Sequence, residues 1–277
     1  MTATLANLKP VMISGREVLP IVEGGKGVGA SNGRSAGAFA AAGAVGTISG
    51  VNQLEFDANG NAIPLVYHGT TRVEKHRELV ANGIRAGIQH AKWAHEISNG
   101  QGRIHMNILW EMGGAAEVME GVLEGAKGLV HGVTCGAGMP YRLSELAAKH
   151  NVFYHPIISS MRAFRALWKR AYSKVSELMG AVVYEDPWLA GGHNGLSNAE
   201  DPLKPEDPYP RVKALRAPPL PGQALYDQAT AADIARVQKQ YGQWILDSHL
   251  PPAGTPTQGV EGGYMANAYV RMRHPDF

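Results

Sequence analysis

Short apolar runs alternate with amphipathic segments between about residue 18 and residue 216 of this chain. An apolar run of four to eight residues bounded by turn residues is typical of a buried strand. Apolar residues three and four positions apart are typical of a helix. The pattern predicts six core strands, at residues 18–23, 44–49, 104–109, 129–134, 152–158 and 181–184.

Helical patterns fill the intervals between these strands. The clearest begins at Thr71-Arg-Val-Glu74, which matches a helix capping box, and its apolar stripe runs to about Ser98. Gly83 and Gly87 interrupt this helix, and their spacing permits a close approach of another backbone at a cost of roughly 1 kcal/mol each against alanine. Further helices are predicted at residues 32–42, through 118–123, at 144–150 and at 160–179.

A local excursion separates the second strand from the long helix. Two short extended segments, residues 54–57 and 63–67, flank Asn59-Gly60, which is a strong hairpin turn signal. Pro64 cannot donate a backbone hydrogen bond, so the second arm is expected at an edge.

The order of these elements predicts an α/β fold. Six consecutive strand–helix units favour a barrel or a doubly wound open sheet. Glycines follow nearly every strand, which favours a (β/α)8-type barrel, incomplete or atypically closed because only six units are found. We therefore expect a barrel-type domain at residues 1–216. Residues 217–277 hold 7 of the 17 prolines, and we expect an irregular C-terminal segment with one helix from Thr230 and a strand within 264–272.

Composition excludes several classes of protein. Of 277 residues 44% are hydrophobic, enough for a packed core, and 18% are charged with a formal net charge of +2. This balance indicates neither a nucleic-acid partner nor a membrane partner. The single cysteine, Cys135, excludes an internal disulfide, and no metal site is indicated. With no signal-peptide pattern at the N-terminus, we expect a cytoplasmic protein. The densest basic group is interpreted as a solvated helix face: Arg162, Arg165, Lys169 and Arg170.

A glycine-rich loop, Gly24-Gly-Lys-Gly-Val-Gly29, follows the first predicted strand. It is not a P-loop, because Lys26 is followed by Gly27 rather than by serine or threonine. A dinucleotide-binding fingerprint is matched only loosely by Gly25-x-Gly27-x-x-Ala30 and is disfavoured, because Ser49-Gly50 stands where the ribose-binding acid is required. Two further interpretations stay open. The loop lets the backbone approach a flavin or a phosphate, or it is a simple tight turn.

Several chemically capable side chains fall within or just after strands. Asn107 could hydrogen-bond the edge of a ring, or be satisfied within the core. Buried, hydrogen-bonded roles are favoured for the strand histidines, and a passive role is favoured for Cys135, for which the sequence establishes no base partner. The strand histidines are His105, His131 and His155.

His193 follows two glycines, Gly191 and Gly192, beyond the sixth predicted strand. Enzymes with parallel sheets place their chemistry at this end of the strands. Glycines without side chains let the backbone approach a flat ligand closely. The segment predicts either a cofactor-facing loop or a glycine-rich turn with a surface histidine.

These segments together resemble the nitronate monooxygenase family, formerly called 2-nitropropane dioxygenases. The resemblance covers roughly residues 10–216 and depends on the order and spacing of its pieces. The matching pieces are residues 22–33, residues 41–48, His105-Met-Asn107, Gly132-Val-Thr-Cys-Gly-Ala-Gly-Met-Pro140 and Ala190-Gly-Gly-His193.

The resemblance implies an FMN-containing barrel that oxidises alkyl nitronates with molecular oxygen. His193 would be the base, removing the α-proton of a nitroalkane or orienting the anionic nitronate. Lys26 stands where many family members carry methionine, and could favour an anionic flavin or substrate or point outward. No nucleic-acid or membrane partner is implied, and a homo-oligomer is compatible with the sequence. The residues that would line the flavin are Gly25, Lys26, Gly27, Asn107, Ser159, Gly191 and Gly192.

The chain departs from the family in its last sixty or so residues. In the family, strands seven and eight and their loops hold the FMN phosphate, whereas the match here stops near Arg216. The tail covers the gap in an unfamiliar way, a partner chain completes the barrel, or the chain is a truncated or rearranged relative. Two other functions stay open: an enzyme similar to the FMN-dependent enoyl-carrier-protein reductases, and a catalytically silent remnant.

Overall fold

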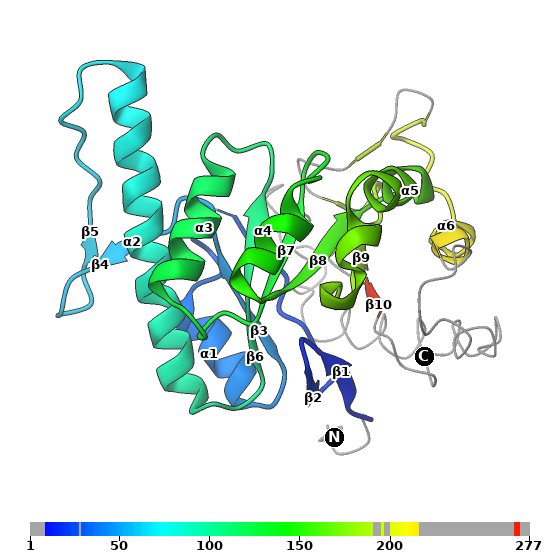
Figure 1. Ribbon diagram of the computed structural model, residues 1–277, viewed down its shortest axis with the longest axis horizontal. Helices are drawn as coiled ribbons and strands as arrows, with labels where there is room; N and C mark the ends of the chain where they lie inside the picture. The colour runs from blue at the N-terminus through cyan, green and yellow to red at the C-terminus, as the bar shows by residue number, and fades with distance from the viewer. Residues whose placement is uncertain (1–8, 28, 191–194, 197–199, 216–268, 272–277) are drawn as a thin grey trace, which may run out of the picture.

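A six-stranded sheet forms the centre of the computed structural model, which describes residues 9–27, 29–190, 195–196, 200–215 and 269–271 (Figure 1). Its order is β10-β9-β8-β7-β6-β3, in which the five strands from β9 to β3 are parallel and β10 is antiparallel to β9. An isolated parallel bridge between Val22 and Val45 extends the sheet beyond β3. The strands are β3 (Val45–Ser49), β6 (Arg103–Leu109), β7 (Gly132–Gly136), β8 (Phe153–Ile158), β9 (Val182–Tyr184) and β10 (Tyr269–Arg271).

The helices pack against one face of this sheet. Alternate strand residues such as Ile104, Met106 and Val133 form one core cluster with side chains from α1 to α5. The other face carries His105, Asn107 and their neighbours. A doubly wound sheet has helices on both faces, so this one-sided packing is the arrangement of a barrel wall. The helices are α1 (Gly33–Ala41), α2 (Arg72–Ser98), α3 (Ala115–Gly125), α4 (Leu143–His150), α5 (Met161–Arg170), the 3-10 helix η2 (Tyr172–Leu178) and α6 (Pro208–Leu215).

The predicted α/β fold is therefore confirmed. Within the described residues the sheet ends at the Val22 bridge on one side and at β10 on the other, so it forms an arc and not a closed barrel. Four of the six predicted strands lie within two residues of their predicted bounds, while β7 begins three residues later than predicted. The helix predicted from Thr230 lies outside the described residues, and β10 lies within the strand predicted at 264–272.

The first predicted strand, at residues 18–23, is wrong as a single strand. Its first residue ends β2 (Arg16–Val18), which pairs antiparallel with β1 (Val11–Ile13), and its later part makes only the Val22 bridge. Pro20 lacks the N–H that a continuous central strand would need. Ser14 and Gly15 both have positive φ, 47° and 71°, which is the geometry of a two-residue hairpin turn with a right-handed twist.

The long helix and the hairpin before it are confirmed. The Thr71 side chain accepts from the Glu74 backbone N–H and the Glu74 side chain accepts from the Thr71 N–H, so α2 begins with the predicted capping box. Strands β4 (Glu55–Phe56) and β5 (Ala62–Ile63) pair around the predicted turn, but the second arm ends at Ile63 and does not continue to Tyr67 as predicted. A Cβ on Gly87 would lie 2.5 Å from Cγ2 of Val122, which shows how closely α2 and α3 pack.

The helix predicted at residues 160–179 is wrong in its second half. α5 ends at Arg170, Ala171 has φ −141° and ψ −54°, and η2 follows. The Tyr154 hydroxyl of β8 donates to the carbonyl oxygens of Tyr172 (3.3 Å) and Val175 (3.0 Å), and so ties η2 to the sheet. A tertiary hydrogen bond therefore stabilises a break that the local pattern does not show.

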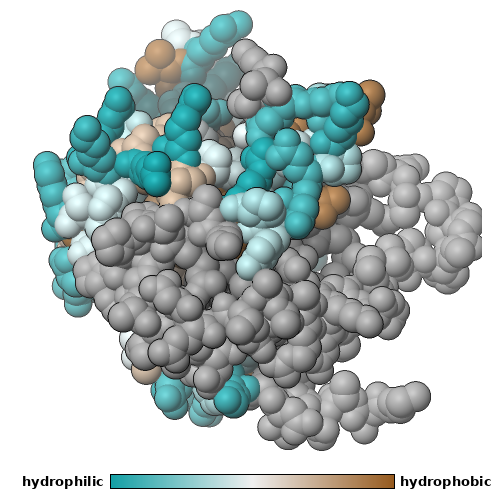
Figure 2. All heavy atoms as spheres, turned by 90° about the vertical axis from the view of Figure 1, so that its right-hand side faces the viewer, coloured by the Kyte–Doolittle hydropathy of each residue, from teal (hydrophilic) through white to brown (hydrophobic). Residues whose placement is uncertain are grey.

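The basic group on α5 is solvated, as predicted. Phe164 and Leu167 are buried, whereas the four basic side chains of this helix are exposed. Figure 2 shows the side of the molecule that carries α5 and α6, where most of the coloured surface is hydrophilic and apolar side chains appear only as separate spots.

Candidate active site at the carboxyl edge of the sheet

The carboxyl ends of the parallel strands bring two predicted site residues into direct contact. Asn107 is near the end of β6, and Gly25 follows the Val22 bridge. A Cβ built on Gly25 would lie 2.2 Å from both Cβ and Cγ of Asn107. Only glycine therefore fits at position 25, and its backbone lies on the half-buried Asn107 amide.

The glycine-rich loop is closed by Ser31. The Lys26 N–H donates to Ser31 Oγ at 2.9 Å, and the Ser31 hydroxyl donates to the Gly24 carbonyl at 3.0 Å. Gly27 is exposed, and a Cβ there would meet nothing within 4 Å. The loop is thus fixed at its base beside Asn107, while its tip at Gly27 faces open space.

Lys26 lies beside the buried carboxyl of Glu23 and remains partly exposed. Its ammonium lies 3.7 Å from Glu23 Oε1, and the Glu23 side chain is 2% exposed. The Thr47 N–H donates to Glu23 Oε2 at 3.0 Å. Burial raises the pKa of Glu23, against the lowering effects of the Thr47 hydrogen bond and the Lys26 charge. The sequence did not predict Glu23 as a site residue, because an acid at the end of a short apolar run does not indicate burial.

Ser159 follows β8 and contacts the segment beyond β9. Its hydroxyl donates to the Gly195 carbonyl at 3.2 Å, and Gly195 has a φ of 68°. The chain after β9 therefore returns over the end of β8. The three other predicted site residues, Gly191, Gly192 and His193, lie outside the described residues.

Glu185 is a second carboxyl at this edge that sequence reasoning missed. It directly follows β9, and its N–H donates to the Ile158 carbonyl at 2.9 Å, which continues the parallel ladder by one step. Burial raises the pKa of Glu185 to about 7. The signal that could have found it is an acid placed directly after an apolar strand, residues 181–184.

His105 and His155 have the buried, hydrogen-bonded roles that were favoured, whereas His131 lies just before β7 and is half-buried. His105 and His155 are each 2% exposed, and both Nε2 atoms are hydrogen-bonded to the Ser14 hydroxyl. His131 Nδ1 accepts from the Ile104 N–H at 3.0 Å. Burial lowers the pKa of all three, to about 4 for His131 and to about 3 for His155. These residues belong to the amino end and middle of the sheet rather than to its carboxyl edge.

Cys135 has the passive role that was favoured. It is fully buried in the core cluster between sheet and helices, and burial raises the pKa of its thiol. This is the face of the sheet opposite to Asn107, because neighbouring residues of a strand point to opposite faces.

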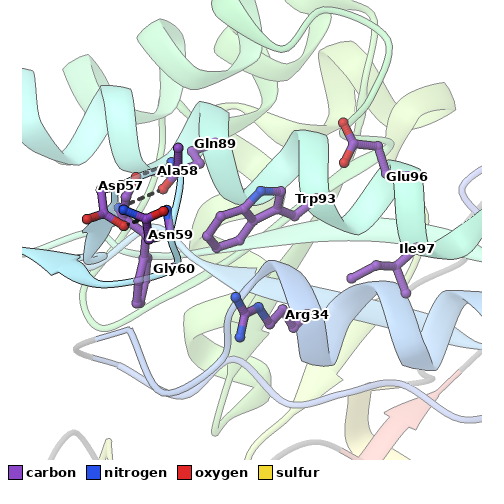
Figure 3. A pocket seen from close by; sticks show the side chains of 10 residues that line it. Arg34, Asp57, Ala58, Asn59, Gly60, Gln89, Trp93, Glu96 and Ile97 are labelled. Carbon is purple, nitrogen blue, oxygen red and sulfur yellow. Dashed lines mark hydrogen bonds between the residues drawn. The ribbon is translucent and has the colours of Figure 1, made fainter.

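A surface groove of about 470 Å³ lies apart from this edge, between α1, α2 and the β4–β5 hairpin. Figure 3 shows the Trp93 side chain of α2 in its centre, with Arg34 of α1 beside it and the Asp57–Gly60 turn at one end. The Arg34 guanidinium carbon lies 5.2 Å from the centre of the Trp93 ring. The groove shares no residue with the predicted site.

Among the described residues, no group of three or more His, Cys, Asp and Glu side chains could hold a metal ion. In that part of the chain, every helix is too short or too polar to cross a bilayer.

Among known proteins, the chain resembles solved structures only weakly. No protein-family model and no curated protein matches the chain. The solved structure of FabK from Thermotoga maritima matches with a TM-score of 0.41 and 16% sequence identity, covering 68% of this chain and 44% of the FabK chain. The chain thus spans less than half of that protein.

Proposed function

We propose that this chain is a flavin-dependent oxidoreductase that oxidises alkyl nitronates with molecular oxygen and holds FMN at the carboxyl edge of its sheet. The observation that supports it best is the contact between Gly25 and Asn107. A backbone without a side chain, lying on a strand amide, leaves a flat polar edge of the kind that a planar ring can approach.

The described residues suit the ring of a flavin. Gly25, Gly27 and Asn107 would line one side, Ser159 would lie near its far edge, and Lys26 would place a cation at the mouth. Gly191 and Gly192 complete the set by resemblance. The Lys26 side chain is 33% exposed, so its ammonium could also meet an anionic substrate or ring. We assign no residue to the FMN phosphate.

FMN would supply the electron chemistry when bound, and the protein would supply position and electrostatics. His193 is proposed as the base, acting on the α-proton of a nitroalkane or orienting the nitronate. An imidazole suits proton transfer near neutrality because its unperturbed pKa is about 6.5. We also propose residues 1–216 as the flavin-binding unit and a cytoplasmic location, with no nucleic-acid or membrane partner.

The absorption spectrum of the purified chain tests the proposal. We expect the two bands of oxidised flavin, release of FMN on denaturation, and oxygen consumption with ethyl nitronate that needs no nicotinamide. A colourless protein that FMN does not reconstitute contradicts the proposal. Reduction of the flavin by a reduced nicotinamide favours the enoyl-carrier-protein reductase alternative instead.

A further inference from the structure

Glu185 lies on the same face of the sheet as the predicted flavin residues. His155 and Ile157 of β8 face away from the helices, since His155 stacks on His105 and a Cβ on Gly136 would meet Ile157 at 2.8 Å. Val183 is the register partner of Ile157. Two residues further along each strand come Ser159 and Glu185, so both point to that face at its carboxyl edge.

The carboxylate of Glu185 is not bound by any other described side chain. Throughout the part of the chain that the structure describes, it has no hydrogen-bond or ion-pair partner. Its neighbour Asp186, by contrast, is 4% exposed and accepts the Trp188 N–H at 3.0 Å. Keeping an ionised carboxylate half-buried without a partner costs folding free energy, unless the group binds a proton or a ligand.

We infer that Glu185 removes the α-proton of neutral nitroalkanes, so that this site takes nitroalkanes as well as nitronates. The inference rests on the proposed function and divides between two residues the roles given to His193 alone. His193 is left to orient the anion.

The proton balance is simple. The C–H bond next to the nitro group breaks, its electron pair moves into the nitro group, and the proton passes to the Glu185 carboxylate. The products are a nitronate anion and a neutral carboxylic acid. Burial favours the neutral form of Glu185, and therefore makes the carboxylate a stronger base than it is in water.

No charged side chain among the described residues contributes to the raised pKa of Glu185. From β8 the neighbouring side chains on its face are Ser159 and, lower down, His155, whose pKa burial lowers to about 3 so that it is neutral. On its own segment Asp186 is held by the Trp188 N–H. In the part of the chain that the structure describes, the raised pKa of Glu185 is due to burial.

Comparing a neutral and an ionised substrate tests the inference. Oxygen consumption is measured with nitroethane and with preformed ethyl nitronate, for the wild type, Glu185→Gln and the matched control Glu177→Gln, an exposed glutamate of η2. We expect Glu185→Gln to lose roughly 100-fold in kcat/KM on nitroethane, the usual size of a general-base effect, and to stay within threefold on ethyl nitronate. Equal losses on both substrates, or none on nitroethane, overturn the inference.

A second measurement does not depend on oxidation. Exchange of the α-protons of nitroethane in D₂O is followed by proton NMR with the protein as purified, without oxygen. We expect catalysed exchange that rises as pH passes about 7, is absent in Glu185→Gln and persists in His193→Asn. Exchange lost in His193→Asn and kept in Glu185→Gln assigns the proton transfer to His193 and overturns the inference. A wild type that exchanges protons but oxidises neither substrate contradicts the proposed function alone.

Discussion

The imidazole rings of His105 and His155 stack with their centroids 4.4 Å apart and an interplanar angle of 29°. They come from β6 and β8, and Gly132 of the intervening β7 leaves room between them, since a Cβ there would lie 2.8 Å from Nε2 of His105. The Ser14 hydroxyl, in the turn of the β1–β2 hairpin, contacts both Nε2 atoms, at 2.8 and 3.0 Å. Two neutral histidines thus hold the hairpin against the face of the sheet that the helices do not cover.

This arrangement predicts a loss of stability in mild acid. The folded-state pKa of His155 is lowered to about 3, while that of the unfolded chain stays near 6.5. Between these values the unfolded state binds the extra proton, so stability is full above pH 6.5 and falls as pH decreases toward 3. The expected slope from His155 is about 1.4 kcal/mol per pH unit, before contributions from His105 and His131. Urea unfolding at a series of pH values measures it.

Replacement of single histidines separates this cause from general acid sensitivity. His155→Gln removes the titrating group, and we expect the slope of unfolding free energy between pH 4 and 6 to decrease by about 1.4 kcal/mol per pH unit. His68→Gln, at an exposed position, should leave the slope unchanged. An unchanged slope in His155→Gln would show that this histidine is already charged in the folded protein.

The contact between Gly25 and Asn107 predicts a position-specific effect in the glycine-rich loop. Gly25→Ala places a methyl group 2.2 Å from Asn107 atoms and must displace either the loop or the amide. We expect FMN affinity to fall at least tenfold, measured by flavin fluorescence during titration. Gly27→Ala enters open space and should leave the Tm unchanged.

The combination Gly25→Ala with Asn107→Ala distinguishes displacement from a lost flavin contact. The smaller side chain at 107 relieves the clash, so the Tm should recover toward that of Asn107→Ala alone. If FMN affinity recovers as well, Asn107 does not contact the ring, and the assignment of that residue fails.

The sequence predicted the parts of the fold that local chemistry determines. The α2 capping box, the Asn59-Gly60 turn and the alternation of apolar runs all depend on residues close together in the chain. The capping box and the turn were confirmed, and so were five of the six predicted core strands. The break at Ala171 was not predictable, because the Tyr154 hydroxyl that stabilises it belongs to strand β8, outside the helical segment. The β1–β2 hairpin was missed because Ser14-Gly15 is a weaker turn signal than Asn-Gly.

The residues of the candidate site were likewise predicted only in part. Gly25 and Ser159 were predicted just after strands and Asn107 within one, and the parallel sheet brings the ends of its strands to one edge. Glu23 and Glu185 were missed because their importance comes from burial, which depends on residues distant in the sequence. Periodicity predicts which positions are apolar, but it does not show which charged residue the fold will enclose.

Removal of the buried Tyr154 hydroxyl should lower the free energy of unfolding by a measurable amount. Tyr154→Phe keeps the ring, which lies 5.0 Å from that of Tyr172, and removes the donor to the carbonyls of Tyr172 and Val175. The net contribution of such a hydrogen bond to stability is about 0.5–1.5 kcal/mol. Chemical denaturation should show this decrease, whereas Tyr209→Phe, on α6, should change stability by less than about 0.5 kcal/mol.

Two glycines of α2 should respond oppositely to alanine. A Cβ on Gly83 would lie 3.4 Å from Val118, an ordinary contact, whereas one on Gly87 would lie 2.5 Å from Val122. Gly83→Ala should stabilise the protein by up to about 1 kcal/mol, because alanine restricts the unfolded chain and favours the helix. Gly87→Ala should destabilise it by about 1–3 kcal/mol through overpacking against α3. Thermal and urea unfolding measure both, and Val122→Ala should restore most of the loss in Gly87→Ala. If Val122→Ala gives no such recovery, the close approach of α2 and α3 at Gly87 is not the source of the strain.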